Sequence, residues 1–416
     1  MRVIVAHPDR QHSFFLAMAL KKKGILDAYI TTIYDKETSI TARVKKILKG
    51  NIKKKAASRK CEFLDDKDVI QYNELFNLCI VFLSKFSKLL NLCRLLRMRL
   101  ADSFGIKVAK KAIADGCDIV IMYDGTALSC FRYLEKHAPE IVRVLDTSIV
   151  SHSFMKDVFE KECSVTKDDV LKQEYAYLWK PRLLKRYDDE IELAQYFLVP
   201  SRVVAESLKI NNGVKEYQLL KVPYGVNIDN FKVKIRNEVN KRLKLVFVGQ
   251  VTCRKGIHHI LNAINQFDSD QIEIAIAGAY DQNEIWYKEN CRKENVKFLG
   301  FVTRDKIVEL YNSADVFVLP SLAEGMALVG LEALACGLPV VCSKYAGIDD
   351  IIEEKKNGFI CDVFEENSLI DIFNWCIKNK SKLLEMKKAC RSTAEKYSWD
   401  IYYENVAAAV MGLLRG

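Results

Sequence analysis

The chain has 416 residues, of which 50% are hydrophobic and 28% charged, so it is neither disordered nor short enough for one compact core. A net charge of +10 favours anionic partners, such as nucleotide phosphates, acidic lipid or nucleic acid, without separating them. Thirteen cysteines without a C-x-x-C pair exclude a regular zinc or disulfide framework and favour reduced thiols in the cytoplasm.

Alternating short β-branched runs and helical segments organise the first half of the chain. A strand–helix–strand start predicts a parallel sheet. We expect Ser201 to cap a helix, because serine is favoured at that position. The predicted strands cover residues 2–7, 28–34, 118–124, 141–146, 196–201 and 217–226, and predicted helical regions include 12–24, 107–116 and 155–193.

A basic segment interrupts this alternation. About half of residues 43–60 are Lys or Arg and none is acidic, and residues 74–100 read as one long amphipathic helix with a basic face. The segment is either a solvated insertion with a core-packing helix, a membrane-surface anchor, or a nucleic-acid binder. We expect an anionic membrane surface rather than nucleic acid. No run reaches the ~18 uncharged apolar residues of a spanning helix, and we expect no signal peptide. The expected location is the cytoplasm, in solution or on the inner face of the cell membrane.

A second β/α series occupies the second half. Two series of this kind predict two doubly wound α/β domains, at residues 1–222 and 223–396. Ligands of such sheets bind beyond the carboxyl ends of the strands, so we expect the site in a cleft between the domains. The predicted strands are 244–250, 271–278, 296–301, 315–321, 339–343 and 358–362.

Loops after three of these strands carry unusual residues. Arg254 and Lys255 precede a helix whose free N–H groups favour anions, so a diphosphate would fit there. The alternative is two solvated surface charges. The loop YAGIDDII (345–352) places a glycine at a strand–helix junction, which allows a close backbone approach or forms an ordinary tight turn.

Two carboxylates frame the remaining loop, LAEGMALVGLE (322–332). Glu324 stands beside Gly325, where backbone can approach a ligand, and Glu332 falls among leucines on the following helix. A carboxylate in such surroundings needs a partner, and a pair of ribose hydroxyls is a suitable one. The alternative is a surface glutamate on the polar side of the helix.

The combined motifs resemble the donor domain of retaining glycosyltransferases of family 4. They are FVGQVTCRKGIHHIL, GFVTRDKIVELYNSADVFVLPSLAEGMALVGLEALACGLPVVCSKYAGIDDII and NGFICD, within residues 240–400. The resemblance implies a GT-B fold. VPYGVNIDNF (222–231) is similar to the segment that joins the two domains. YSWDIYYENV (397–406) is similar to the terminal helix of the family, which implies that residues 397–416 cross back to the first domain.

The resemblance also implies roles for individual residues. Glu332 would bind the nucleotide ribose, Glu324 would lie near the donor sugar and the reacting centre, and Arg254 and Lys255 would hold the diphosphate. Many relatives have glycine where this chain has Ala327. The further donor-binding positions are Gly249 and the backbone of Gly325, Met326, Ala327 and Leu328, with Phe301 and Val302 near the base.

The first domain resembles the family less closely. VLDTSIVSHSF (144–154) implies that His152 is the family's histidine near the donor sugar, and a polar loop histidine is the alternative. Residues 190–208 contain Gln195 where the family has aspartate, and we expect Glu192 and Ser201 to be structural. The family's glycine-rich N-terminal loop is replaced by AHPDRQHS (6–13), from which His12 could line the cleft.

These features predict a retaining, hexosyltransferase-type enzyme that uses a nucleotide sugar. UDP-sugar is favoured and GDP-sugar is possible as donor, and the acceptor would be a glycan or a lipid-linked sugar of surface polysaccharide or glycolipid synthesis. No Asp-x-Asp motif is placed to hold a metal on the diphosphate, so we expect neither metal nor other cofactor. The alternatives are a sugar-nucleotide epimerase of the same fold and a catalytically silent protein that binds sugar nucleotide or membrane.

Overall fold

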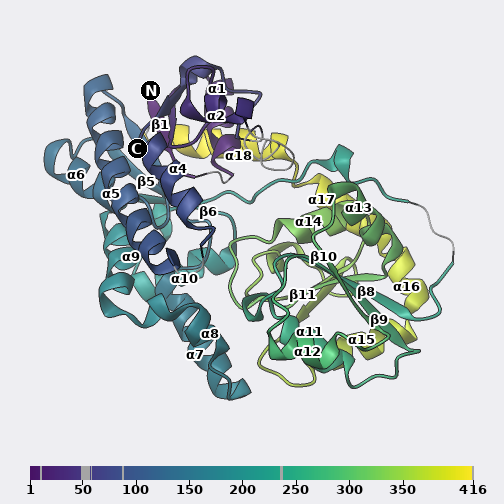
Figure 1. Cartoon of the computed structure of the whole chain (residues 1–416). Helices are drawn as coiled ribbons and strands as arrows, with labels where there is room; N and C mark the ends of the chain where they lie inside the picture. The colour runs from purple at the N-terminus through teal and green to yellow at the C-terminus, as the bar shows by residue number, and fades with distance from the viewer. Residues whose placement is uncertain (10–11, 48–56, 58, 87–88, 235–237, 415–416) are drawn as a thin grey trace.

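A computed structural model of the chain describes residues 1–9, 12–47, 57, 59–86, 89–234 and 238–414. It has two α/β domains side by side, each built on a parallel sheet (Figure 1). The first sheet has the order β3-β2-β1-β4-β5-β6-β7. Its strands are β1 Val3–Ala6, β2 Leu26–Thr31, β3 Val69–Gln71, β4 Ile119–Tyr123, β5 Val142–Asp146, β6 Tyr196–Val199 and β7 Leu219–Lys221.

Helices connect these strands and cover the sheet. Strands β1, β4 and β5 are buried along almost their whole length, as expected for a parallel sheet with helices on both faces. The helices are α1 Ser13–Lys22, α2 Ile40–Ile47, α4 Glu74–Leu83, α5 Leu90–Asp115, α6 Leu128–His137, α7 His152–Thr166, α8 Val170–Glu174, α9 Pro181–Leu193 and α10 Arg202–Asn212.

The second sheet has the order β10-β9-β8-β11-β12-β13. Its first strand begins 22 residues after the last strand of the first sheet ends (243 − 221 = 22), so the predicted boundary at 222/223 falls in the connecting segment. The strands are β8 Leu243–Val248, β9 Ile272–Ala277, β10 Val296–Gly300, β11 Val316–Leu319, β12 Val340–Ser343 and β13 Gly358–Cys361. The helices are α11 Ile257–Ile264, α12 Ile285–Asn290, α13 Arg304–Ser313, α14 Leu328–Ala335, α15 Ser368–Lys378, α16 Lys380–Glu385 and α17 Lys387–Glu395.

The last helix, α18 (Trp399–Gly412), returns to the first domain and packs against α1 (Figure 1). Trp399 stacks on Phe15 with 3.7 Å between ring centroids, and Lys23 pairs with Glu404. Together, two parallel sheets and a terminal helix that crosses between the domains confirm the predicted GT-B architecture.

The prediction of one helix over residues 74–100 is wrong. The structure has two helices, α4 and α5, and α5 continues to Asp115, so it absorbs the helix predicted at 107–116. Folding back lets Ile80 of α4 pack with Cys93 and Leu100 of α5 in a small apolar cluster of their own. A single straight helix would leave these side chains in water. Strand β3 was not predicted, because three residues carry too little alternation to be recognised. Residues 48–56 and 58 of the predicted basic segment lie outside the described residues.

Candidate donor-binding site

The loop between β8 and α11 carries Arg254 and Lys255 in a short 3-10 turn, Cys253–Lys255. Gly256 follows with φ 75°, and a Cβ there would lie 2.0 Å from the Pro320 carbonyl oxygen. Glycine is therefore required for the loop to lie against the end of β11. α11 begins at the next residue, so the two cations stand where the sequence predicted them, directly before a helix N-terminus.

The Glu324 carboxylate forms ion pairs with both of these cations. Its Oε1 is 2.7 Å from Arg254 Nη1 and 2.5 Å from Lys255 Nζ, and Arg254 also donates to the Ala323 carbonyl at 2.6 Å. The three side chains are only 12–16% exposed. Burial lowers the pKa of Lys255, although Glu324 acts in the opposite direction. The structure thus contains a buried cationic pair whose anion is a carboxylate of the same protein.

Glu332 lies on α14 among different partners. Burial raises its pKa to about 7, while Arg304 and a hydrogen bond with Tyr311 act to lower it. A carboxylate that burial has largely deprived of water needs hydrogen-bond donors to stay ionised. This environment fits the predicted ribose contact better than the alternative of a glutamate on the polar helix surface.

Gly325 brings the Glu324 loop against the first domain. A Cβ on Gly325 would lie 1.9 Å from the Ser148 carbonyl oxygen, in the loop that follows β5. The Ser201 hydroxyl donates to the Gly325 carbonyl. Ser201 is the N-cap residue of α10, as predicted, although its side chain makes no capping bond. The hydroxyl joins the two domains instead.

The loop 345–352 supports the same junction. Tyr345 and Ala346 accept backbone hydrogen bonds from Glu324 and Ala327 at 3.1 and 3.2 Å. Asp349 pairs with Arg202 of the first domain at 2.9 Å. The Ala327 N–H is therefore already engaged, and the glycine-containing loop holds the Glu324 loop in place rather than forming an isolated tight turn.

Phe301 and Val302 connect β10 with α13. Phe301 is 89% exposed, which makes its ring available to a flat partner. Gly249 directly follows β8, and its carbonyl oxygen would lie 1.6 Å from a Cβ on Gly278. The Gly278 N–H also donates to the Gly300 carbonyl at 2.8 Å, so the loops after β8, β9 and β10 lie against one another.

His152 is the first residue of α7, where Ser151 accepts from the Phe154 N–H. Its ring stacks on Tyr187 with centroids 3.6 Å apart, and burial lowers its pKa to about 4. The imidazole is therefore neutral near pH 7. It also contacts Tyr177, with ring centroids 5.9 Å apart.

Tyr175 is a site residue that the sequence reasoning missed. Its hydroxyl accepts from Arg254 Nε at 3.0 Å, and its ring lies 6.3 Å from that of Tyr177. A line of aromatic rings thus connects His152 with Arg254 across the domain boundary. The run YAYLW (175–179) was the available signal, since aromatic residues crowded in a polar segment indicate a packed surface.

His12 lies at the carboxyl end of β1, in a polar cluster that was not predicted as a whole. Its Nε2 is 3.2 Å from Asp146 and 3.1 Å from the Tyr224 hydroxyl. Asp146 ends β5 and is almost fully buried. The cluster joins strand ends of the first sheet to the segment that links the domains.

Glu190, two residues before Glu192, is the glutamate of this segment that binds the backbone of the first domain. Glu192, which we expected to be structural, is exposed. The Glu190 carboxylate accepts from the backbone N–H groups of Gly125, Ala127 and Leu128, at the start of α6. Burial raises its pKa to about 7. Gln195 accepts from the Arg143 N–H at 2.9 Å and so helps to align β5 with β6.

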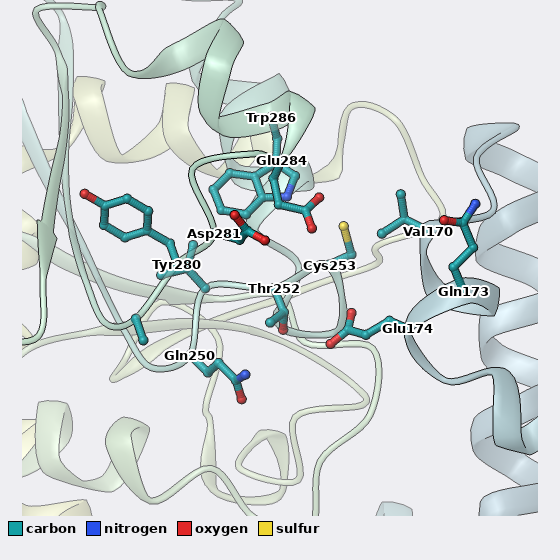
Figure 2. A pocket seen from close by; sticks show the side chains of 12 residues that line it. Val170, Gln173, Glu174, Gln250, Thr252, Cys253, Tyr280, Asp281, Glu284 and Trp286 are labelled. Carbon is teal, nitrogen blue, oxygen red and sulfur yellow. The ribbon is translucent and has the colours of Figure 1, made fainter. Parts of the chain in front are cut away.

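A pocket of about 610 Å³ opens beside these loops, between the domains (Figure 2). It contains none of the predicted site residues, although Thr252 and Cys253 directly precede Arg254. Glu174, Asp281 and Glu284 line it, so it repels a diphosphate and suits a neutral, hydroxyl-rich group. The rest of its lining is Val170 and Gln173 of α8, with Gln250, Val251, Ala279, Tyr280 and Trp286.

Part of the chain matches a known protein family. Residues 229–396 match the family model of glycosyl transferases group 1. An uncharacterized glycosyltransferase of Methanocaldococcus jannaschii is 31% identical over 209 residues, which are 46% of this chain and 50% of that protein. The amylovoran biosynthesis glycosyltransferase AmsK of Erwinia amylovora is 27% identical over 195 residues, 44% of this chain and 48% of that protein. The chain thus spans about half the length of these curated relatives.

Solved structures match over the whole chain. Sucrose-phosphate synthase from Thermosynechococcus elongatus aligns with a TM-score of 0.65 at 15% identity, over 100% of this chain and 99% of that one. HepE of Anabaena, in complex with UDP and glucose, aligns with a TM-score of 0.60 at 16% identity, over 99% and 100% of the two chains. At such identities the likeness concerns the fold. The chain therefore has the GT-B fold, and its second domain is similar to the glycosyl transferases group 1 family.

Proposed function

We propose that the protein is a retaining, hexosyltransferase-type glycosyltransferase that moves a sugar from a nucleotide-sugar donor to a glycan or lipid-linked acceptor. The observation that carries the proposal is the buried pair Arg254 and Lys255, which holds an anion at the start of α11. A protein that only recognised neutral sugars would have no use for two desolvated cations there.

In the proposed reaction the donor diphosphate displaces the Glu324 carboxylate from the two cations. Arg254, Lys255 and the α11 N-terminus then stabilise the negative charge that develops on the leaving diphosphate. Glu324, released from the cations, faces the sugar, where a carboxylate stabilises oxocarbenium character. Attack from the face that the diphosphate leaves, with the diphosphate oxygen accepting the acceptor's proton, would retain the anomeric configuration. No step in this scheme requires a metal ion.

Other residues would fix the nucleoside. Glu332 accepts from the ribose hydroxyls, Phe301 and Val302 contact the base, and His152 lies on the sugar side. UDP is the favoured nucleotide, because a similar fold, HepE, has been solved with UDP and glucose; a GDP-sugar is the second candidate. The acidic pocket of Figure 2 suits the acceptor, since carboxylates accept hydrogen bonds from sugar hydroxyls.

A membrane-bound acceptor is supported by the α4–α5 hairpin. Leu75 and Phe82 lie on one face of α4 by their spacing and are 62% and 58% exposed, and Phe86 beyond the helix is 50% exposed. Leu90, Leu92 and Leu95 of α5 are 44–48% exposed. Arg94, Arg97 and Arg99 stand between and after these leucines, all exposed. Apolar side chains among cations fit an anionic lipid surface, which would hold the protein on the inner face of the cell membrane.

The same residues bear on the other interpretations of the basic segment. A core-packing helix would not leave these phenylalanines and leucines in solvent, and nucleic-acid binding would not require them. Among the described residues, no helix combines the length and apolar character needed to cross a bilayer, so contact would be at the surface.

Vesicle flotation tests the membrane contact. We expect the protein to float with anionic vesicles and to stay at the bottom of the gradient with neutral ones. Phe82→Ser with Phe86→Ser should abolish flotation. Ile210→Ser with Tyr217→Ser is the matched control, because these residues are also exposed but lie far from the hairpin in sequence. Equal binding to neutral vesicles, or unchanged flotation of the Phe82/Phe86 variant, would count against the membrane contact.

A turnover assay tests the reaction. A thermal-shift panel of nucleotides and sugar nucleotides selects the donor, and the selected sugar nucleotide is then incubated with lipid and glycan acceptors. We expect an acceptor-dependent, sugar-bearing product with the anomeric configuration of the donor. An acceptor-independent conversion of the donor would indicate an epimerase. Tight nucleotide binding without any product would indicate a catalytically silent protein.

A further inference from the structure

A second junction between the domains contains Glu162 of α7 and the consecutive His258 and His259 of α11. Glu162 Oε1 is 2.8 Å from His258 Nε2 and 3.0 Å from His259 Nε2. The Glu162 side chain is 2% exposed, and the two histidines are 16% and 15% exposed. Two imidazoles thus converge on one buried carboxylate, from the domain opposite to it.

Hydrogen bonds within the protein account for only part of this arrangement. The second carboxylate oxygen, Glu162 Oε2, is buried and has no hydrogen-bond partner, and neither does Nε2 of His259. Buried carboxylate oxygens are rarely left without a donor or an ion, because desolvation of the charge is not offset. A cation beside this carboxylate would compensate the charge that the unpartnered oxygen carries, and the unpartnered Nε2 of His259 is a further ligand atom.

The donor atoms have the spacing of metal ligands. One ligand atom from each of Glu162, His258 and His259 lies within 4.8 Å of the other two. For metal–ligand distances of about 2.0–2.1 Å, donor separations of 2.8 and 3.0 Å correspond to ligand–metal–ligand angles of about 90°. Such angles suit three ligands on one face of a five- or six-coordinate ion, the arrangement of two-histidine, one-carboxylate sites.

We propose that Glu162, His258 and His259 bind a divalent transition-metal ion, such as Zn²⁺, that links the two domains. Its remaining positions would hold water, because a pocket of about 220 Å³ lined by Glu162 and His258 opens beside them. Asp168, Glu284 and Glu289 also line that pocket, so the surroundings attract a cation.

The position gives the ion a structural consequence. α11 begins at Ile257, two residues after Lys255, and both histidines lie in its first turn. An ion at this place would link α11, which follows Arg254 and Lys255, to α7, the helix that begins with His152. It lies outside the predicted diphosphate site, and the expectation that sugar transfer needs no metal on the diphosphate is a separate one.

Metal titration of the full chain, purified without a histidine tag and stripped with a chelator, tests the proposal. We expect one equivalent of Co²⁺ to give visible absorption bands, one equivalent of Zn²⁺ to displace it, and elemental analysis to find one ion per chain. Glu162→Gln and His259→Gln should each lose the stoichiometric binding. His137→Gln, at an exposed histidine of α6, is the matched control and should bind as the unaltered protein does.

The partial exposure of His259 makes His259→Gln the safer variant if Glu162→Gln does not fold, which circular dichroism would reveal. Zn²⁺ should also raise the melting temperature of the unaltered protein and leave that of His259→Gln unchanged. The proposal is overturned if the stripped protein takes up no stoichiometric metal, since the three side chains would then form only a hydrogen-bonded bridge. Unchanged Co²⁺ spectra in both ligand variants would overturn it equally.

Discussion

The Glu324 carboxylate oxygen lies 2.5 Å from Lys255 Nζ, and the same oxygen contacts Arg254. An anion of the protein thus occupies the position that we assign to the donor diphosphate. This relationship makes Glu324 a competitor of the donor before it acts on the sugar, and the two roles can be separated by experiment.

Replacing Glu324 by Gln should separate them. The amide no longer neutralises Arg254 and Lys255, so the affinity for UDP should rise, by about tenfold if one charged contact is removed from competition. Sugar transfer should fall about 100- to 1,000-fold, because the carboxylate is lost from the reacting centre. Calorimetry with UDP and turnover with the sugar nucleotide measure the two effects. A parallel fall in both would contradict the competition.

Gly325→Ala should weaken the contact between the two domains at the Glu324 loop. The added methyl group would lie 1.9 Å from the Ser148 carbonyl oxygen, so the Glu324 loop must withdraw from the first domain, at a cost of about 1–3 kcal/mol. We expect a larger radius of gyration by small-angle X-ray scattering, and strongly reduced turnover. Gly412→Ala is the control, since no atom lies within 4 Å of a Cβ there. A compact, active Gly325→Ala protein would refute the contact.

The donor affinity should depend on pH through Glu332. Burial raises its pKa to about 7, so the carboxylate that accepts from ribose is lost as pH falls below that value. The Kd for UDP should rise by up to about tenfold per pH unit below pH 7, and Glu332→Gln should remove this dependence while weakening binding. A pH profile of the Kd from pH 5 to 8 measures it; a profile shared by both proteins would exclude Glu332 as its source.

The free energy of unfolding should fall as pH rises, whereas the affinity for the donor should rise. A raised pKa means that the folded state favours the protonated acid, so Glu332 stabilises least above pH 7, where its desolvation is not offset. The stability of Glu332→Gln relative to the unaltered protein should therefore increase from pH 5 to pH 8, by up to about 3 kcal/mol. Urea unfolding at both pH values tests the sign, and a gain only at pH 5 would contradict it.

Phe301→Ala should weaken nucleotide binding without destabilising the fold. The ring is 89% exposed, so its removal loses little buried area, whereas stacking of an aromatic ring on a base is worth about 1–3 kcal/mol. We expect the Kd for UDP to rise roughly 5- to 150-fold and the melting temperature to stay unchanged. Tyr217→Ala, another exposed aromatic residue, is the control. An unaltered Kd would place the base elsewhere.

The sequence was sufficient for the architecture but not for the helical hairpin. Short apolar runs such as β8 and β9, with glycines between the elements, indicated both sheets. The break between α4 and α5 has no proline or glycine to mark it, and it depends on Ile80 packing against Cys93, a contact between separate helices. Local patterns do not contain such contacts, so they predict one continuous helix.

The sequence likewise indicated some residues of the candidate site and not others. Arg254, Lys255 and Glu324 lie on two loops of one domain, and their motifs indicated that they would meet. Tyr175, Ser148 and the Ser201 hydroxyl reach these loops from the other domain, and only the folded structure brings them there. Glu162 with His258 and His259 is a further case, because their positions are about 96 residues apart and follow no spacing rule.

The central claim is that Arg254 and Lys255 hold a diphosphate, and calorimetric titration of UDP into the unaltered protein and Lys255→Ala tests it most directly. Uridine, which lacks the phosphates, and Lys344→Ala, on the neighbouring loop, are the controls. We predict stoichiometric UDP binding that Lys255→Ala weakens at least about tenfold, with uridine binding changed little and Lys344→Ala unaffected. Equal UDP affinity in the unaltered protein and a folded Lys255→Ala protein would contradict the account.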